Sequence, residues 1–446
     1  MSAAALPVPE NLERFPEWHP ALDANAALVE AHRCLYCADA PCTGACPTHI
    51  DVPRFIKKIA SGNLRGSARA ILDANILGLS CARVCPVDVL CQGACVMQRY
   101  NAKPIQIGLL QRFAMDAFYD SGTRLAAAAP ARKGRVACVG GGPASLSCAA
   151  ELRRNGYAAT IIDNRPLPGG LNTYGVAEYK LRPSDSLREI DLVRRLGVEF
   201  QQGTVGGTVA LESLERDYDF IFLGMGLGAM ERLGIPGEEL GGVIDALKFI
   251  ERYKTASRTR VGPRVVVVGA GNTAIDAANA ARRLGAEEVH IIYRRTEREM
   301  PAFRFEYENS RVEGVEFHWL LAPVAILATP EEPGRVGALR VIRTRTGAPD
   351  ASGRSRPEPV PGSEFDFPCD QVIPAVGQSR LMENLESSHG IRLRQGTIDV
   401  DRATGQTSNS RYFAGGDCVN GGREVVDAVA DGKRAARAII ARLEVR

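Results

Sequence analysis

The sequence predicts a helical N-terminal domain followed by two α/β folds, one inserted in the other. Two observations support this prediction. Eight of the twelve cysteines lie between Cys34 and Cys95, among segments whose apolar residues recur at helical spacing. Two later segments, starting at Val136 and Gly262, each show the order strand, glycine turn, helix, strand. We therefore expect a helical domain over residues 1–125, a first α/β fold over 131–235 and 370–446, and a second over 236–369.

Composition places the chain among ordinary globular proteins and excludes several kinds of partner. It has 446 residues, 45% hydrophobic and 24% charged. A formal net charge of +3 is too small to indicate binding to nucleic acid or to an anionic membrane. The N-terminal residues lack the basic and apolar regions of a signal peptide, and no apolar run is long enough to span a bilayer. We expect a soluble, cytoplasmic protein.

The cysteines fall into two runs whose spacing indicates iron–sulfur clusters. Between Cys34 and Cys46 the gaps are two, four and three residues, and between Cys81 and Cys95 they are three, five and three. A proline directly follows Cys46 and Cys85, as is typical of loops that wrap a cluster. Zinc is the first alternative, although only one C-x2-C knuckle exists, and disulfides are the second. Spacing alone predicts two [4Fe–4S] clusters, each held by four cysteines.

The segment from Val136 to Asp163 predicts a Rossmann-like unit. Gly140 permits the tight turn after the first strand, and Gly142 lets the backbone approach a pyrophosphate at the helix N-terminus. Ser145 occupies the third fingerprint position and is small enough for close packing of helix on strand. Asp163 ends the second strand, where an acid accepts hydrogen bonds from ribose hydroxyls. The sequence therefore predicts a dinucleotide site here.

A second Rossmann-like unit follows from Gly262, and its second strand ends differently. Gly269 and Gly271 form the turn, but the strand runs into Arg294 and Arg295 instead of an acid. Guanidinium groups at this place suit the 2′-phosphate of NADP(H). Alternatively, the two arginines face solvent or contact the pyrophosphate.

Two further glycine loops are weaker candidates for cofactor contacts. The pair Gly169–Gly170 could let the backbone approach a cofactor, although an ordinary β-turn explains it equally well. Gly416 and Asp417 end a loop before the last helix, where the acid could hold a hydroxyl of a flavin cofactor or simply cap a helix.

Five segments together resemble a known family of iron–sulfur flavoproteins: RCLYCADAPCTGACPT, LGLSCARVCPVDVLCQGAC, IGLLQRF, VGGGPASLSCA and FAGGDCVNGG. The chain resembles the electron-input module of NAD(P)-dependent dihydropyrimidine dehydrogenase, which in bacteria is a separate small subunit. It is also similar to the glutamate synthase small subunit and to the large subunit of ferredoxin-linked transhydrogenase. The resemblance covers nearly the whole chain.

The resemblance implies cluster ligands that spacing alone does not give. One [4Fe–4S] cluster would take Cys34, Cys37, Cys42 and Cys95. The other would take Cys46, Cys85 and Cys91, with Gln111 of the IGLLQRF segment as the fourth ligand. Cys81 would then be a spare thiol beside this second cluster, and the symmetrical division into four and four cysteines would not apply.

The resemblance also implies which fold holds which nucleotide. FAD is assigned to Gly140, Gly142, Ser145, Asp163, Gly170, Leu171, Lys180, Gly416, Asp417 and Val426. NAD(P)H is assigned to Gly269, Gly271, Asn272, Thr273, Arg294, Arg295 and Gly377. Bacterial dihydropyrimidine enzymes use NADH, whereas the two arginines favour NADPH, so the choice stays open at this point. No side chain is needed as an acid–base catalyst for hydride transfer, and none is assigned.

The implied function is an oxidoreductase subunit that passes electrons from NAD(P)H through FAD and two [4Fe–4S] clusters to a partner. The expected partner is an FMN/iron–sulfur barrel subunit of a hetero-oligomer that reduces uracil or thymine, or runs the reverse reaction, in pyrimidine catabolism. Electron input to glutamate synthase or to a transhydrogenase is the alternative. A disulfide reductase is disfavoured because the four later cysteines form no C-x-x-C pair, and intact glycine turns disfavour a scaffold without activity.

Overall fold

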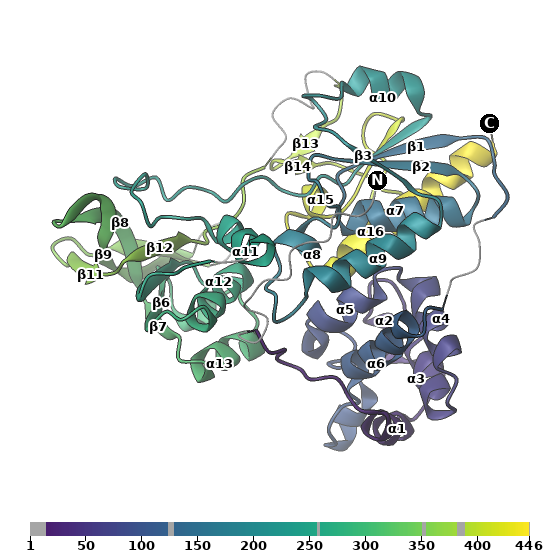
Figure 1. The fold of residues 1–446 in the computed structure, drawn as a ribbon, viewed down its shortest axis with the longest axis horizontal. Coiled ribbons are helices and arrows are strands. Elements are labelled where there is room, and N and C mark those ends of the chain that lie inside the picture. Colours follow the sequence, from purple (N-terminus) through teal and green to yellow (C-terminus); the bar gives the residue numbers. More distant parts are fainter. Residues whose placement is uncertain (1–14, 124–128, 257–258, 350–353, 381–388, 446) are drawn as a thin grey trace. The chain divides into compact units, whose positions relative to one another are not determined.

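A computed structural model of the chain describes residues 15–123, 129–256, 259–349, 354–380 and 389–445 (Figure 1). It divides into two compact units. The large unit comprises residues 17–173, 180–227 and 380–446, and the small unit comprises residues 1–16, 174–179 and 228–379. Residues 1–14 and 124–125 of the expected helical domain lie outside the described residues.

The N-terminal part of the large unit is helical. Its elements are α1 (Ala24–His32), α2 (Pro41–Gly44), α3 (Val52–Ala60), α4 (Leu64–Ala74), α5 (Gly78–Val84), the 3-10 turns η2 (Val87–Val89) and η3 (Val96–Tyr100), and α6 (Ile107–Asp120). Three of these helices begin at a side-chain cap, because Asp23, Asp51 and Asn63 accept backbone N–H groups of the first turn. Buried apolar faces, with Phe55, Ile71 and Leu110 fully enclosed, pack the helices around the cysteine runs.

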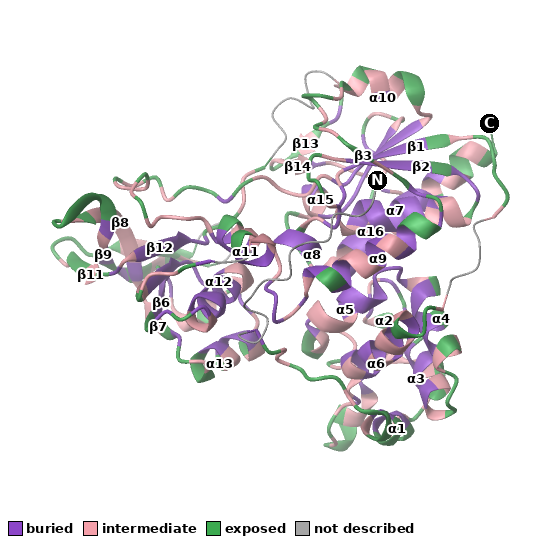
Figure 2. Ribbon diagram, in the orientation of Figure 1, coloured by how far each residue is buried: buried purple, intermediate pink, exposed green. Residues whose placement is uncertain are grey.

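The rest of the large unit is a parallel five-stranded sheet in the order β15-β4-β1-β2-β3. The strands are β1 (Arg135–Val139), β2 (Ala158–Asp163), β3 (Glu199–Gln202), β4 (Phe220–Leu223) and β15 (Tyr412–Ala414). Its helices are α7 (Pro143–Arg154), α8 (Leu171–Tyr174), α9 (Pro183–Arg195), α10 (Leu211–Asp217), α15 (Asp417–Asn420) and α16 (Val425–Glu444), and a small ribbon joins β13 (Leu393–Arg394) to β14 (Thr397–Ile398). Figure 2 shows buried residues along α7, α9 and α16.

The small unit has a parallel sheet in the order β12-β5-β6-β7 and an antiparallel layer of β8 to β11. The parallel strands are β5 (Arg264–Val268), β6 (Glu288–Tyr293), β7 (Glu316–Trp319) and β12 (Gln371–Pro374), accompanied by α11 (Ala246–Thr255), α12 (Asn272–Arg283), the turn η4 (Glu297–Glu299) and α13 (Arg304–Val312). The antiparallel strands are β8 (Leu321–Thr329), β9 (Glu332–Pro349), β10 (Ser355–Pro359) and β11 (Phe365–Pro368). β9 and β10 pair antiparallel, from Ser355↔Pro349 to Pro359↔Thr344, and residues 350–353 between them lie outside the described part.

One strand lies in a different sheet from the one that the division at residue 370 implies. β12 pairs in parallel with β5, from Gln371↔Val265 to Pro374↔Val268, and so completes the second βαβ sheet. The local pattern predicts a strand followed by a glycine turn, but the pairing partner of a strand is not encoded locally. Across the described residues, the structure contains no helix long and apolar enough to cross a bilayer.

Candidate cluster and nucleotide sites

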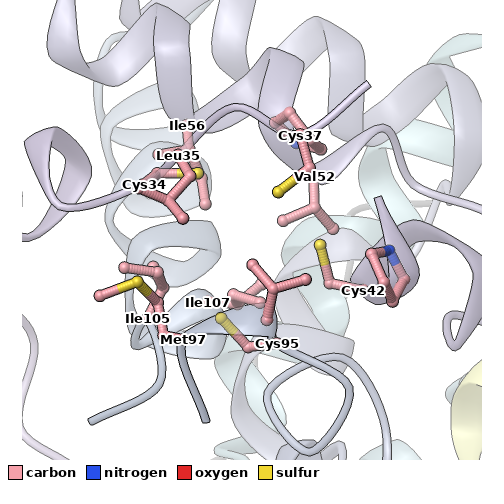
Figure 3. A pocket seen from close by; sticks show the side chains of 13 residues that line it. Cys34, Leu35, Cys37, Cys42, Val52, Ile56, Cys95, Met97, Ile105 and Ile107 are labelled. Carbon is pink, nitrogen blue, oxygen red and sulfur yellow. The ribbon is translucent and has the colours of Figure 1, made fainter. Parts of the chain in front are cut away.

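Four thiols from both cysteine runs line one cavity in the helical part of the large unit (Figure 3). Cys34 and Cys37 follow α1, Cys42 lies in α2, and Cys95 precedes η3. About 350 Å³ of space free of protein atoms lies between the lining side chains, part of it open to solvent. Apolar side chains complete its wall, among them Leu35, Val52, Ile56, Met97, Ile105 and Ile107. The structure thus brings together the set of four that the resemblance implies for one cluster.

The thiols of this cavity are poorly hydrated, and their chemistry suits iron. Burial raises the pKa of Cys42 to about 11, and burial also raises the pKa of Cys34. All four cysteines are free of disulfide bonds. Thiolates at these positions need a bound cation to compensate for lost hydration, and iron is a soft cation that thiolate ligands select. The donor set therefore fits a [4Fe–4S] cluster.

The remaining cysteines of the two runs form a second, more deeply buried group. The pKa of Cys85 is held well above its usual range by a hydrogen bond with Cys81 and by burial, with Cys91 and Cys46 also close enough to contribute. Burial and the neighbouring Cys46 raise the pKa of Cys91 to about 12. Cys81, which the resemblance leaves as a spare thiol, thus contacts a member of this group.

Gln111 lies on α6 with only 7% of its surface exposed. Its Nε2 donates to the carbonyl of Gly78, 2.8 Å away at the start of α5, the helix that carries Cys81. This bond uses the side-chain nitrogen and fixes the amide plane, so the side-chain oxygen is the atom of Gln111 that could coordinate a metal. The contact is compatible with the oxygen ligation that the resemblance implies.

The first glycine turn has the strained backbone and the open space that a pyrophosphate needs. Gly140 has φ +91°, and a Cβ there would lie 2.6 Å from the carbonyl oxygen of Gly224. A Cβ at Gly142 would meet no atom within 4 Å, directly before the N-terminus of α7. Ser145 is fully buried, with its hydroxyl donating to the Val139 carbonyl at 3.4 Å. It fills the close helix–strand contact that the fingerprint predicts.

Asp163 ends β2 beside this turn, as expected, and its carboxylate holds the turn itself. One oxygen accepts the N–H of Gly141, and the other accepts the N–H of Arg165 at 2.7 Å. A carboxylate offers about four acceptor positions, so hydroxyl groups of a ribose could still be bound. Gly170 lies against the same loop, since a Cβ there would meet the Cα of Gly142 at 2.9 Å.

The other residues assigned to FAD occupy the same unit. Gly416 has φ +77° and precedes α15, which begins at Asp417. Burial raises the pKa of Asp417, whose Oδ1 accepts the Arg423 N–H at 3.2 Å. Val426 is buried in the first turn of α16, and Leu171 is partly exposed at the start of α8. The ammonium group of Lys180 lies 5.4 Å from the ring centre of Trp18, a contact that the sequence did not suggest.

The second glycine turn in the small unit repeats the first. Gly269 has φ +127°, and a Cβ there would lie 2.3 Å from the carbonyl oxygen of Ala375. A Cβ at Gly271 would have only one neighbour, Pro301 at 3.9 Å, and Gly377, with φ +114°, would have none within 4 Å. Thr273 is partly exposed in the first turn of α12. The Oδ1 of Asn272, however, accepts the N–H of Phe303 at 3.0 Å, which ties the helix start to the next loop.

The two arginines at the end of β6 have different surroundings. Arg294 is exposed, and its side chain has no hydrogen bond or ion pair to the described residues. Arg295 is only 8% exposed, and its Nε donates to the carbonyl of Ser355 at 2.9 Å. Arg294 is therefore the guanidinium that can reach a nucleotide, whereas Arg295 supports the β10 strand.

Glu189 is a buried carboxylate that sequence reasoning missed. It lies on α9, and its oxygens accept the N–H groups of Leu79 at 2.8 Å and Ser80 at 3.0 Å, together with the Ser80 hydroxyl. These groups form the first turn of α5, so the acid caps the helix that carries Cys81. Burial raises the pKa of Glu189 to about 7. No local signal could reveal this contact, because more than 100 residues separate the partners.

Family models match both parts of the chain and define its class. Residues 11–123 match the model described as dihydropyrimidine dehydrogenase domain II, 4Fe-4S cluster. Residues 134–432 match the model of the pyridine nucleotide-disulphide oxidoreductases. The protein is thus an iron–sulfur flavoprotein oxidoreductase, with 4Fe-4S, FAD and NAD(P) as its cofactors.

Characterised relatives narrow the class further. The chain is 38% identical over 450 residues to the glutamate synthase [NADPH] small chain of Escherichia coli K12, covering 97% of this chain and 94% of that one. It is 40% identical over 428 residues to the NADP(+)-dependent formate dehydrogenase subunit beta of Moorella thermoacetica, covering 90% of this chain but only 59% of the relative. The chain belongs to the family of NAD(P)-dependent flavin and iron–sulfur oxidoreductase subunits that includes the glutamate synthase small chain.

Solved structures share the fold of about 70% of the chain. FprA from Mycobacterium tuberculosis in complex with NADPH aligns with a TM-score of 0.58 at 22% identity, over 70% of this chain and 85% of that one. Thioredoxin reductase from Lactococcus lactis aligns with a TM-score of 0.55 at 23% identity, over 70% of this chain and all of that one. At this identity the likeness shows the fold alone, and it confirms the predicted fold class.

Proposed function

We propose that this chain oxidises NADPH and delivers the electrons one at a time to a partner subunit of a hetero-oligomer. The observation that carries the proposal is that one compact unit holds both the open glycine turn and the cavity lined by four thiols. FAD, when bound, exchanges a two-electron hydride for single electrons, and [4Fe–4S] clusters carry single electrons only. A chain that contains both sites can therefore accept electrons in pairs from the nicotinamide and pass them on singly.

The proposed roles of the side chains are binding and positioning. The open space above Gly142 and the N-terminus of α7 would hold the FAD pyrophosphate, and Asp163 would hold the ribose. Gly170, Leu171, Lys180, Gly416, Asp417 and Val426 complete the proposed FAD set. Cys34, Cys37, Cys42 and Cys95 would bind one cluster, and Cys46, Cys85, Cys91 and Gln111 the other. Glu189 fixes α5 against α9 and so holds the second cysteine group in place.

We propose NADPH as the reductant because Arg294 is the exposed cation at the end of β6, where the adenosine ribose lies in such folds. Gly269, Gly271, Thr273 and Gly377 would bind the rest of the nucleotide, with Asn272 and Arg295 as positioning residues. The relatives named above carry NADPH or NADP(+) in their own descriptions. A guanidinium pairs with the 2′-phosphate and gains nothing from NADH, which lacks it.

The test measures kcat/KM for NADPH and NADH with ferricyanide as acceptor, using anaerobically purified protein that contains flavin and iron. Arg294→Ala should lower the NADPH-to-NADH preference by about 10- to 100-fold, because one exposed charge-assisted pair contributes about 1–3 kcal/mol. The matched control is Arg298→Ala, which removes a nearby exposed arginine and should leave the preference unchanged. An unaltered preference in Arg294→Ala would remove this residue from the nucleotide site.

Two partners remain as candidates for the electrons. End-to-end similarity to the small chain of glutamate synthase supports a glutamine-dependent glutamate synthase partner. The match of residues 11–123 to domain II of dihydropyrimidine dehydrogenase supports an FMN/iron–sulfur subunit that reduces uracil or thymine. Co-purification, followed by NADPH oxidation with 2-oxoglutarate plus glutamine or with uracil, decides between them. If the copurified complex oxidises NADPH neither with 2-oxoglutarate plus glutamine nor with uracil, both partner proposals fail. NADPH oxidation with ferricyanide still tests whether the chain accepts electrons from NADPH.

A further inference from the structure

Three metal-binding side chains meet on one face of the parallel sheet in the small unit. His290 lies on β6, and Glu316 and His318 lie on the neighbouring strand β7. The register pairs His290 with Glu316 and Ile292 with His318. Because alternate residues of a strand share a face, all three side chains emerge on the same side. The sheet itself therefore brings them together, and none of them belongs to the proposed nucleotide or cluster sites.

The distances between the three donor atoms match a tetrahedral metal site. His290 Nδ1 lies 3.1 Å from His318 Nε2 and 3.5 Å from Glu316 Oε2, and His318 Nε2 lies 3.9 Å from the same oxygen. A tetrahedron with metal–ligand bonds of about 2.05 Å has edges of about 3.3 Å. The three atoms thus already lie near three corners of such a tetrahedron, without movement of the backbone.

The surroundings hold the two imidazoles and leave one side open. His290 is 8% exposed, whereas Glu316 is exposed to solvent. The ring of Phe367 on β11 packs against both imidazoles, with ring centres 4.9 Å from His290 and 5.1 Å from His318. Glu288 Oε2 lies 3.7 Å from the other ring nitrogen of His290, the place of the carboxylate that orients a metal-bound histidine.

We propose that His290, Glu316 and His318 form a binding site for a divalent transition-metal cation of the Zn²⁺ class, with water in the fourth position. Two imidazoles and one carboxylate suit zinc and its neighbours better than Ca²⁺ or Mg²⁺, which prefer six or more oxygen ligands. Bound metal clamps β6 to β7 and thereby stiffens the strand that leads to Arg294.

The test measures zinc in the oxidised, cluster-loaded protein after incubation with Zn²⁺ and gel filtration. Wild type should retain about one more zinc per chain than His318→Gln, and its thermal midpoint should rise with Zn²⁺ while that of the variant does not. Binding should weaken about 100-fold or more in the variant, since even loss of an outer-shell partner costs 10- to 100-fold. Any zinc bound by cysteines is the same in wild type and variant, so the difference in zinc content reports this site alone. Unchanged visible absorbance shows that the clusters are intact.

Two further variants keep the test decisive. Glu316→Gln alters an exposed side chain, so it should fold normally and still bind zinc more weakly than wild type. His389→Gln removes a histidine of the large unit and should bind zinc like wild type. Co²⁺ retained by the oxidised protein after gel filtration should give an EPR signal that is lost in His318→Gln, because oxidised flavin and oxidised [4Fe–4S] clusters give none. Equal zinc content in wild type, His318→Gln and Glu316→Gln would overturn the proposal.

Discussion

The two units carry the same glycine turn, but the structures attached to the turn differ. In both, the first glycine has positive φ and lies against a backbone carbonyl of a neighbouring strand end, Gly140 near Gly224 and Gly269 near Ala375. In the large unit the second strand ends in an acid that holds the turn, and α9 reaches the cysteine-bearing helix α5. In the small unit it ends in an exposed arginine, and an antiparallel layer takes the place of the helical domain. In the function proposed above, the turn binds phosphate in both units, and the elements attached to it differ.

The comparison predicts that equivalent glycine substitutions remove different cofactors. Gly142→Ala and Gly271→Ala each place a methyl group in open space, at negative φ, so both variants should fold. Overpacking typically costs 1–3 kcal/mol, so Gly142→Ala should bind FAD about 10- to 100-fold more weakly and lose flavin on gel filtration. Gly271→Ala should keep its flavin and raise KM for NADPH by about the same factor.

The control for both variants is Gly334→Ala, which also adds a methyl group in open space but lies in the antiparallel layer. It should change neither flavin content nor KM. Loss of flavin from Gly271→Ala would contradict the division of cofactors between the two units.

The large unit alone is expected to hold clusters, and the fourth ligand of the buried cysteine group can be tested directly. Gln111→Ala should lose the EPR signal of one reduced cluster and lower the iron content from roughly eight to roughly four per chain. Cys81→Ala should keep both signals. Cys138→Ala removes another fully buried thiol, on β1, and serves as the matched control. The reverse result, loss in Cys81→Ala but not in Gln111→Ala, would make Cys81 the ligand.

Glu189 gives the large unit a buried connection whose loss should destabilise it. Glu189→Ala leaves two backbone N–H groups and the Ser80 hydroxyl without their acceptor. Each unsatisfied buried group costs about 1–3 kcal/mol, so the three groups together predict a loss of at least about 3 kcal/mol. The midpoint of the first urea unfolding transition measures it. Glu189→Gln retains an acceptor oxygen and should lose much less stability. Equal losses of stability in both variants would show that the hydrogen bonds from Leu79 and Ser80 to this oxygen are unimportant.

The smallest expected effect is the pH dependence that Glu189 contributes to the large unit. Burial raises the pKa of Glu189 from 4.5 to about 7, so the folded state holds a proton that the unfolded state has released between these values. Stability from this group is therefore complete below about pH 4.5 and decreases as pH rises through 7, by about 3 kcal/mol at most. The difference in stability between wild type and Glu189→Gln should follow this curve from pH 5 to 8. A difference independent of pH would show that Glu189 is ionised throughout.

Local signals predicted the elements of both folds well. The strand, glycine turn and helix expected from Val136 correspond to β1, Gly140 to Gly142, and α7, because strand pattern, glycine and helix start are all encoded within a few residues. Asp163 likewise lies at the end of β2, where the pattern put it.

Contacts between distant segments were not predictable. The acceptor role of Glu189 joins residues about 110 positions apart, and the engagement of Arg295 with Ser355 depends on how the β9–β10 hairpin folds. The meeting of His290 with His318 depends on strand register, which the sequence of either strand alone does not specify. For the same reason β12 could be recognised as a strand but not assigned to its sheet.

The wall of the thiol-lined cavity has a consequence for biosynthesis. Cys34, Cys37 and Cys42 emerge from the ribosome early, but Cys95 and the apolar residues Ile105 and Ile107 close the cavity from the other run. The pocket cannot form until synthesis has passed Ile107, because Cys95 and Ile107 follow Cys34 by 61 and 73 residues (95 − 34 and 107 − 34). Cluster delivery to this cavity must therefore wait until both of its sides are present.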